Sequence, residues 1–128
     1  MGNRKVVVTG LGLATALGLE VEENWRKALS GVSGVSKIKL PLAEKSLVQA
    51  AGQVSAEDWD RLEREFPSEA EWEGERRTLF ALWAAKKALS DAALAQDRGD
   101  RSRFGVVLGS GLGINRLEDI HNWLSPDR

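Results

Sequence analysis

The sequence predicts an α/β fold, a mixed sheet covered by helices, on three observations. Two short β-branched apolar runs, Lys5–Thr9 and Phe104–Leu108, are typical of strands that are buried on both faces. Segments with the helical period of apolar residues lie between them, the longest at Glu75–Ala95. No repeat, low-complexity stretch or domain linker interrupts the 128 residues, a length that suits one domain or part of one.

The first of these runs opens an N-terminus that imitates a secretory signal. Arg4 and Lys5 precede the apolar run Val6–Leu19, and Ala14-Thr15-Ala16 resembles a signal cleavage site. Glycines and threonines interrupt the run, which at about 14 residues is too short to span a bilayer. We interpret it as a buried strand followed by a turn, and expect a cytoplasmic protein.

A helix is predicted next, over Val21–Ser30. Val21, Trp25, Ala28 and Leu29 fall on one stripe, acidic residues lie at the start, and Gly31 supplies a C-terminal cap. The stripe is the face that we expect this helix to bury. A turn at Gly31–Gly34 and an irregular or edge segment at Val35–Leu42 follow.

The middle of the chain predicts a short strand and then helices. Polar and apolar residues alternate over Val48–Val54, which fits a half-buried strand. Ser55 starts a helix in a near capping-box pattern, and Trp59, Leu62 and Phe66 share one face of it. The remaining elements are a break at Pro67, a second helical region from Ser68 that Gly74 interrupts, the long helix Glu75–Ala95, a charged turn at Gln96–Arg103 and a last helix at about Asn115–Leu124.

The composition excludes several classes of function. Lys and Arg number 18 against 19 Asp and Glu, and a net charge of −1 leaves no electrostatic footprint for nucleic acid or an anionic membrane. There is no cysteine, hence no disulfide, thiolate metal site or cysteine nucleophile. One histidine, His121, excludes His-rich metal sites and paired-imidazole catalysis. We therefore expect no metal or cofactor.

Gly10-Leu11-Gly12 after an apolar run suggests a dinucleotide-binding turn. That fingerprint needs a third Gly or Ala where Thr15 stands, and a helix that begins on the glycines. We interpret the glycines as a turn with close backbone packing. The small residues of the long helix, among them Ala84 and Ala88, permit such packing. A nucleotide-binding domain remains an alternative, and the absence of a nucleotide-induced thermal shift would argue against it.

Gly109-Ser110-Gly111 matches a nucleophile elbow only in part, because Leu108 stands where the first glycine belongs. The sequence shows no base partner for Ser110, and we interpret His121 as a solvated side chain. The five tryptophans are expected to be core or interface anchors, and Trp72 and Trp123, in polar surroundings, are the better candidates for a protein contact.

Two motifs in order carry a family resemblance. The run Lys5–Gly12, with Trp25 and Leu29–Val35, resembles the opening of a β-ketoacyl-acyl-carrier-protein synthase. Phe104–Gly113 resembles that family's next strand and glycine turn. A third stretch resembles the long helix of the same family, on the residues Arg76-Arg77, Phe80, Ala84-Ala85, Ala88-Leu89 and Asp91-Ala92.

The resemblance implies a thiolase-like fold, with two similar α/β halves in five layers, and a dimeric assembly. It implies condensation of an acyl thioester with a malonyl-carrier thioester, in which a cysteine takes the acyl group and two histidines assist decarboxylation. Residues 1–128 match the N-terminal portion, which stops before the cysteine, and His121 matches neither histidine. The resemblance therefore implies no catalytic residue in this chain, but one substrate-binding residue, Leu112, at the position that bounds the acyl pocket.

Strands of the buried parallel type need cover on both faces and neighbours on both edges. We therefore expect an incomplete folding unit that leaves apolar surface for a partner. The expected partners are the remainder of a ketosynthase or a complementary subunit, and acyl carrier protein, with no nucleic acid and no membrane. The alternative is a non-catalytic ketosynthase-like scaffold that docks to a synthase or a carrier protein.

Overall fold

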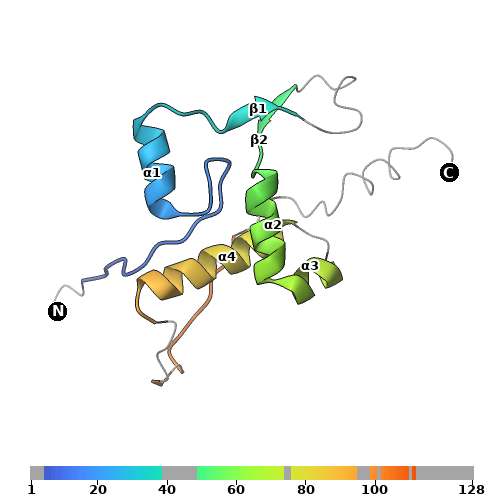
Figure 1. Cartoon of the computed structure of the whole chain (residues 1–128). Helices are drawn as coiled ribbons and strands as arrows, with labels where there is room; N and C mark the ends of the chain where they lie inside the picture. Colours follow the sequence, from blue (N-terminus) through green and yellow to red (C-terminus); the bar gives the residue numbers. More distant parts are fainter. Residues whose placement is uncertain are drawn as a thin grey trace. The chain divides into compact units, whose positions relative to one another are not determined.

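The computed structural model describes residues 5–38, 49–73, 76–94, 99–100, 102–109 and 111 (Figure 1). The chain divides into two units, Met1–Gln96 and Asp97–Arg128. The first unit contains the described helices and strands, and their mixture of types agrees with the predicted α/β class. In chain order they are α1 (Val21–Leu29), β1 (Val35–Lys37), β2 (Ala50–Gly52), α2 (Ala56–Glu65), α3 (Pro67–Glu73) and α4 (Arg76–Asp91).

The described sheet has two strands, β1 and β2, which pair antiparallel from Val35↔Gly52 to Lys37↔Ala50. A further backbone hydrogen bond from Ile38 to the carbonyl of Gln49 extends the ladder at 2.9 Å. The strand predicted over residues 48–54 is thus confirmed at β2, and the predicted edge segment contains β1. Within the described residues the sheet is antiparallel rather than mixed.

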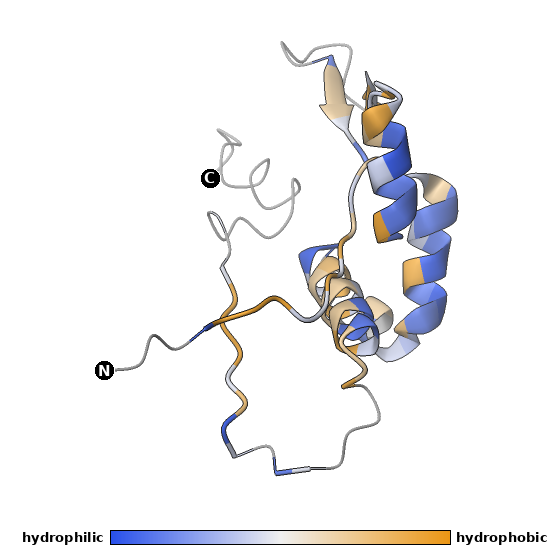
Figure 2. Cartoon of the chain, turned by 90° about the vertical axis from the view of Figure 1, so that its left-hand side faces the viewer, coloured by the Kyte–Doolittle hydropathy of each residue, from blue (hydrophilic) through white to orange (hydrophobic). Residues whose placement is uncertain are grey.

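The two apolar runs predicted to be buried strands form no strand in this structure. In residues 5–9, Val6, Val7 and Val8 are 74–90% exposed, and Figure 2 colours this coil largely as hydrophobic. In residues 104–108, the side chains of Val106, Val107 and Leu108 are 75–99% exposed. Both predictions are wrong here. A strand of this type gains its hydrogen bonds and cover from neighbours, and the described sheet contains β1 and β2 but neither of these runs.

Helix α1 begins at the predicted residue and ends one residue before the predicted Ser30, but it does not bury the predicted face. Gly31, at φ +69°, ends the helix in a Schellman motif, in which the amides of Gly31 and Val32 donate to the carbonyls of Ala28 and Lys27. Its apolar stripe is open to solvent: Trp25 is 65% and Leu29 70% exposed. The residue that α1 buries is instead Asn24.

The core lies among α2, α4 and the segment that precedes α1. It is formed by Leu19, Leu62, Leu79 and Trp83. Trp59 and Phe66 pack against it, so the predicted buried face of α2 is confirmed. Trp59 meets Phe80 edge-on, with 6.0 Å between ring centroids.

Local features explain where α2 and α3 begin and where α4 ends. The hydroxyl of Ser55 accepts a hydrogen bond from the amide of Asp58 at 3.1 Å, so the predicted N-cap of α2 is confirmed. Pro67 stands at the first position of α3, where its missing N–H costs nothing. Helix α4 ends at Asp91, earlier than predicted, because Ala93 adopts a left-handed backbone with φ 58°. None of the described helices combines the length and apolar character needed to cross a bilayer.

Candidate functional site

The glycine-rich segment, residues 10–19, packs its backbone directly on α4. A Cβ added to Gly12 would lie 2.0 Å from the carbonyl oxygen of Ala84, and one added to Gly10 would lie 2.2 Å from that of Ala88. The amide of Leu11 donates to the carboxylate of Asp91 at 2.8 Å. The glycines therefore serve close packing, as the sequence predicts, and α1 begins well beyond them, unlike the helix of a dinucleotide-binding turn.

A tight turn follows within the same segment. Thr15 and Gly18 exchange backbone hydrogen bonds of 3.1 and 3.2 Å. Gly18 has φ +137°, a conformation that favours glycine. The hydroxyl of Thr15 also accepts from the amide of Leu17 at 3.0 Å. The turn therefore has its own local hydrogen bonds before α1 contributes any.

The polar face of α1 clamps this turn. The side-chain amide of Asn24 donates to the carbonyls of Gly18 (3.0 Å) and Glu20 (2.9 Å), and its oxygen accepts from the hydroxyl of Thr15. The ammonium of Lys27 donates to the carbonyl of Leu17 at 2.6 Å. Asn24 can be buried because these partners satisfy its polar atoms. In the described part of the chain, every buried side-chain nitrogen or oxygen has a partner.

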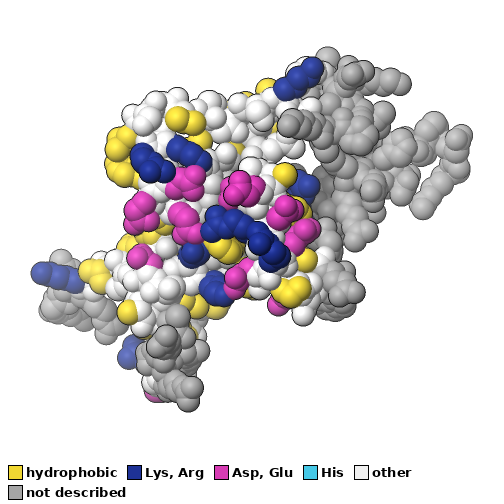
Figure 3. Space-filling view, viewed as in Figure 1, with side chains coloured by type: hydrophobic (Ala, Val, Ile, Leu, Met, Phe, Trp, Pro, Cys, Tyr) yellow, Lys and Arg dark blue, Asp and Glu magenta, His cyan; other side chains and the backbone are white. Residues whose placement is uncertain are grey.

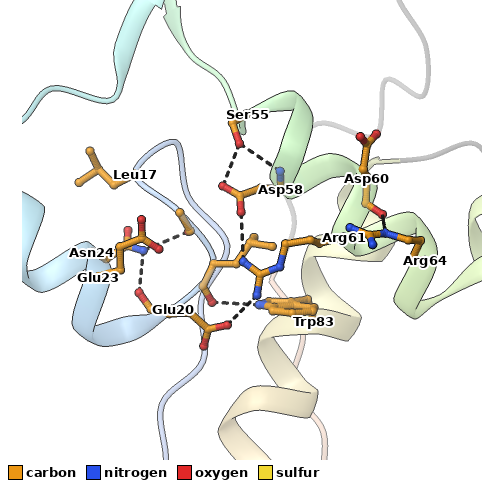
Figure 4. Close-up of polar contacts among 12 residues, drawn as sticks. Leu17, Glu20, Glu23, Asn24, Ser55, Asp58, Asp60, Arg61, Arg64 and Trp83 are labelled. Atoms are coloured by element: carbon orange, nitrogen blue, oxygen red, sulfur yellow. Dashed lines mark hydrogen bonds and ion pairs between the residues drawn. The ribbon is translucent and has the colours of Figure 1, made fainter.

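Glu20 joins the segment to α2 and α4. Its carboxylate lies 3.0 Å from the guanidinium of Arg61 on α2 and 3.0 Å from the ammonium of Lys87 on α4. Both cations also face the ring of Trp83, at 5.4 and 4.7 Å from its centroid. The indole N–H of Trp83 donates to the carbonyl of Leu19 at 3.0 Å, and Figure 4 shows Arg61 reaching over Trp83 toward Glu20.

These charges change the titration of two glutamates. Burial alone raises the pKa of Glu20, but hydrogen bonds from Lys87 and Arg61, and the charges of both cations, outweigh it, so the pKa is lowered. The hydrogen bond and charge of Lys27 likewise lower the pKa of Glu23. Lys27 and Glu23 lie 2.6 Å apart. Both carboxylates are thus held in the ionised state.

This arrangement holds a loop in place and offers no acid–base or nucleophilic pair. The carboxylates, amide and cations are engaged with one another or with backbone carbonyls. Figure 3 shows acidic and basic side chains intermixed over this face. Among the described residues, no three His, Cys, Asp or Glu side chains gather to hold a metal ion. An open hollow beside the end of α2 is lined by Asp60, Glu63, Arg64 and Pro67 and adds no further kind of group.

Most of the site residues predicted from the sequence are not among the described residues. Leu112, Ser110, His121 and Trp123 are outside the described residues, and Trp72 belongs to α3. The sequence patterns do not predict the residues that hold the glycine-rich segment: Glu20, Asn24, Lys27, Arg61 and Lys87. An Asn inside a predicted helix is the one local signal, because such a residue competes for backbone hydrogen bonds. The link of Glu20 to Arg61 and Lys87 has no local signal.

Comparison with known proteins points to one family. Residues 3–126 match the family model described as β-ketoacyl synthase, N-terminal domain. The 3-oxoacyl-[acyl-carrier-protein] synthase 2 of Staphylococcus aureus (strain COL) is 33% identical over 95% of this chain and 29% of its own length. The chloroplastic 3-oxoacyl-[acyl-carrier-protein] synthase I of Arabidopsis thaliana is also 33% identical, over 96% of this chain and 28% of its own length.

This chain thus spans less than a third of the length of these curated relatives. The match nevertheless runs through nearly all of its own residues, including the glycine-rich segment and α4. The resemblance seen in the sequence is confirmed. The chain belongs to the β-ketoacyl synthase N-terminal domain family.

Proposed function

We propose that this chain is the N-terminal segment of a β-ketoacyl-acyl-carrier-protein synthase with a thiolase-like fold. It contributes sheet, pocket wall and interface to the decarboxylative condensation of acyl and malonyl thioesters in fatty-acid or polyketide synthesis. The catalytic cysteine and histidines come from residues outside this chain. The working enzyme is a dimeric cytoplasmic assembly that receives its substrates from acyl carrier protein.

The observation that carries this proposal is the family match over residues 3–126 in a chain without cysteine. The matched relatives are named as 3-oxoacyl-[acyl-carrier-protein] synthases. A thiolate is required for an acyl-enzyme of the family's kind, and paired imidazoles are required to stabilise its enolate. This chain has no thiol and one histidine, so the reaction needs groups from another polypeptide or region.

The exposed apolar run at residues 5–9 also supports assembly with a remainder of the synthase that carries the catalytic residues. Val6, Val7 and Val8 present β-branched side chains to solvent, where they gain nothing from burial. A contiguous exposed apolar surface of this kind marks an interaction site in a soluble protein. A strand or sheet edge supplied by the remainder of the synthase would pair its backbone and cover its side chains.

The test is reconstitution. The full chain is co-expressed with the part of the S. aureus synthase 2 that extends beyond the matched stretch, and is supplied with acyl- and malonyl-carrier protein. Mass spectrometry of the carrier detects the 3-oxoacyl product. We expect product with the pair and none with either polypeptide alone, or when the cysteine of the remainder is replaced. Carrier binding without condensation favours the scaffold alternative. The absence of both carrier binding and product contradicts both hypotheses.

Leu112 is proposed to bound the acyl pocket in that assembly. Leu112→Trp fills space at the pocket wall, so we expect the reconstituted enzyme to stop accepting the longest acyl chains while short chains still react. The control is Leu89→Trp, at a leucine on α4 that is 41% exposed. Equal loss at every chain length with Leu112→Trp would mean that this residue does not line the pocket.

A further inference from the structure

Helix α1 is attached to the rest of its unit in an unusual way. No side chain of α1 belongs to the core of the described residues, and its apolar stripe faces solvent. What holds its start is Leu19, which is buried, and Glu20, the N-cap residue. The carboxylate of Glu20 makes no capping hydrogen bond to α1 and turns instead to α2 and α4.

We propose that Glu20 is a positioning residue that locks residues 10–19 and the start of α1 onto α2 and α4. The lock weakens as ionic strength rises, while the α2–α4 core stays folded. This inference rests on contacts within the chain and does not depend on the proposed function.

The geometry favours the carboxylate of Glu20 as the group that links the glycine-rich segment to α2 and α4. Glu20 is the shared partner of two cations that lie 41 and 67 positions away along the chain. Lys87 reaches both carboxylate oxygens at 3.0 Å, and Arg61 reaches one of them at 3.0 Å. Removing the carboxylate therefore breaks the contacts to two helices at once and leaves the two cations beside the ring of Trp83 without their shared anion.

Asp91 also binds the glycine-rich segment to α4, through the amide of Leu11, but Glu20 is the carboxylate that joins the segment to both α2 and α4. Asp58 lies 3.3 Å from Arg61, but on α2 itself, and so does not connect that helix to the glycine-rich segment. Glu23 pairs with Lys27 within α1. The three side chains of the lock are 36–38% exposed, so dissolved ions reach them and screen the pairs.

The experiment uses the full chain and compares Glu20→Gln with Glu22→Gln. Glu22 is exposed on the first turn of the same helix, so both changes remove one acidic charge from the helix start. Hydrogen exchange is followed at the indole N–H of Trp83, which reports contact with Leu19, and at the backbone amides of residues 17–24. Trp83→Phe assigns the indole signal.

Exposed ion pairs of this kind are worth about two- to fivefold each in an equilibrium constant, so the loss of both pairs in Glu20→Gln should speed exchange about four- to 25-fold. Amides of α2 and α4 near Leu62 and Leu79 should change less, and Glu22→Gln should match the wild type. Raising the salt concentration should speed the same amides in the wild type and have little effect in Glu20→Gln.

Reversing the charges of the Glu20–Lys87 pair provides a second test of the proposal. Glu20→Lys should speed exchange further than Glu20→Gln, and adding Lys87→Glu should restore part of the protection. The proposal is overturned if Glu20→Gln behaves like Glu22→Gln, if the core amides accelerate equally, or if the double variant is no better protected than Glu20→Lys. None of these results bears on whether a reconstituted synthase condenses substrates.

Discussion

Glycines in this chain differ in what they require, and the differences are visible residue by residue. Gly12 needs space, because the backbone of α4 occupies the position of a side chain. Gly31 has open space around it but a backbone of φ +69° that only glycine adopts without strain. Gly105 has neither restriction, with nothing within 4 Å of an added Cβ. The same substitution therefore has different consequences at the three positions.

At Gly12 the change to Ala is expected to lower the free energy of unfolding by about 1–3 kcal/mol. The new methyl group would lie 2.0 Å from the carbonyl oxygen of Ala84, so either the segment or α4 must shift. Urea denaturation measures the loss. Gly105→Ala is the matched control and should stay within about 0.5 kcal/mol of the wild type. Equal effects would show that Gly12 does not pack on α4.

Among the secondary-structure elements, α1 and α4 end alike, with different residues at the critical position. Gly31 and Ala93 each follow a helix with a left-handed backbone, at φ +69° and 58°. After α4, the amides of Ala93 and Leu94 donate to the carbonyls of Ser90 and Leu89, as the corresponding amides do after α1. The left-handed region costs about 1–2 kcal/mol for a residue with a Cβ. The end of α4 therefore carries strain that the end of α1 lacks.

Exchanging the two residue types should have opposite effects. Gly31→Ala is expected to destabilise the chain by about 1 kcal/mol, because space is open and only the backbone is strained. Ala93→Gly is expected to stabilise it by about 0.5–1 kcal/mol, since relief of strain exceeds the added chain entropy. Thermal unfolding of both variants decides this. Destabilisation by Ala93→Gly would contradict a strained cap.

At the scale of the whole molecule, substitution of an apolar side chain that faces solvent should affect assembly with a partner but not the stability of the isolated chain. Val7 is 74% exposed, so Val7→Lys should change the stability of the isolated chain by less than about 0.5 kcal/mol. The same change should abolish assembly with the complementary synthase polypeptide, because a charge would be buried in the new sheet. Co-purification measures assembly, with Ser36→Lys on exposed β1 as the control. A large loss of stability in the isolated chain would mean that residues 5–9 are already covered there.

Acid should also weaken the fold through its paired carboxylates. The pKa of Glu20 and of Glu23 lies below the ordinary glutamate value of 4.5 in the folded chain. A lowered folded pKa means that the unfolded chain binds protons first, so the stabilisation is complete above 4.5 and is lost as pH falls through the lowered values. Urea denaturation from pH 7 to pH 3 should show this decline. Glu20→Gln should make it shallower, and an unchanged slope would show that Glu20 does not contribute.

The sequence by itself determined where α1 begins and ends and where α2 begins, because periodicity, the Ser55 cap and the Gly31 turn depend on residues a few positions apart. It also determined the family and the lack of a thiol. It determined the buried face of α2 but not that of α1. Trp25 and Leu29, which were predicted to be buried, face solvent, whereas Asn24, which is outside the predicted stripe, is buried.

Only the tertiary structure decided what holds the glycine-rich segment. Glu20 meets Arg61 and Lys87 across 41 and 67 residues, and Gly12 meets Ala84 on α4. The same holds for residues 5–9, whose composition favours a strand but whose hydrogen bonds depend on neighbours. Local patterns constrain the backbone over a few residues, whereas burial, ion pairing and strand formation are properties of partners that the pattern does not contain.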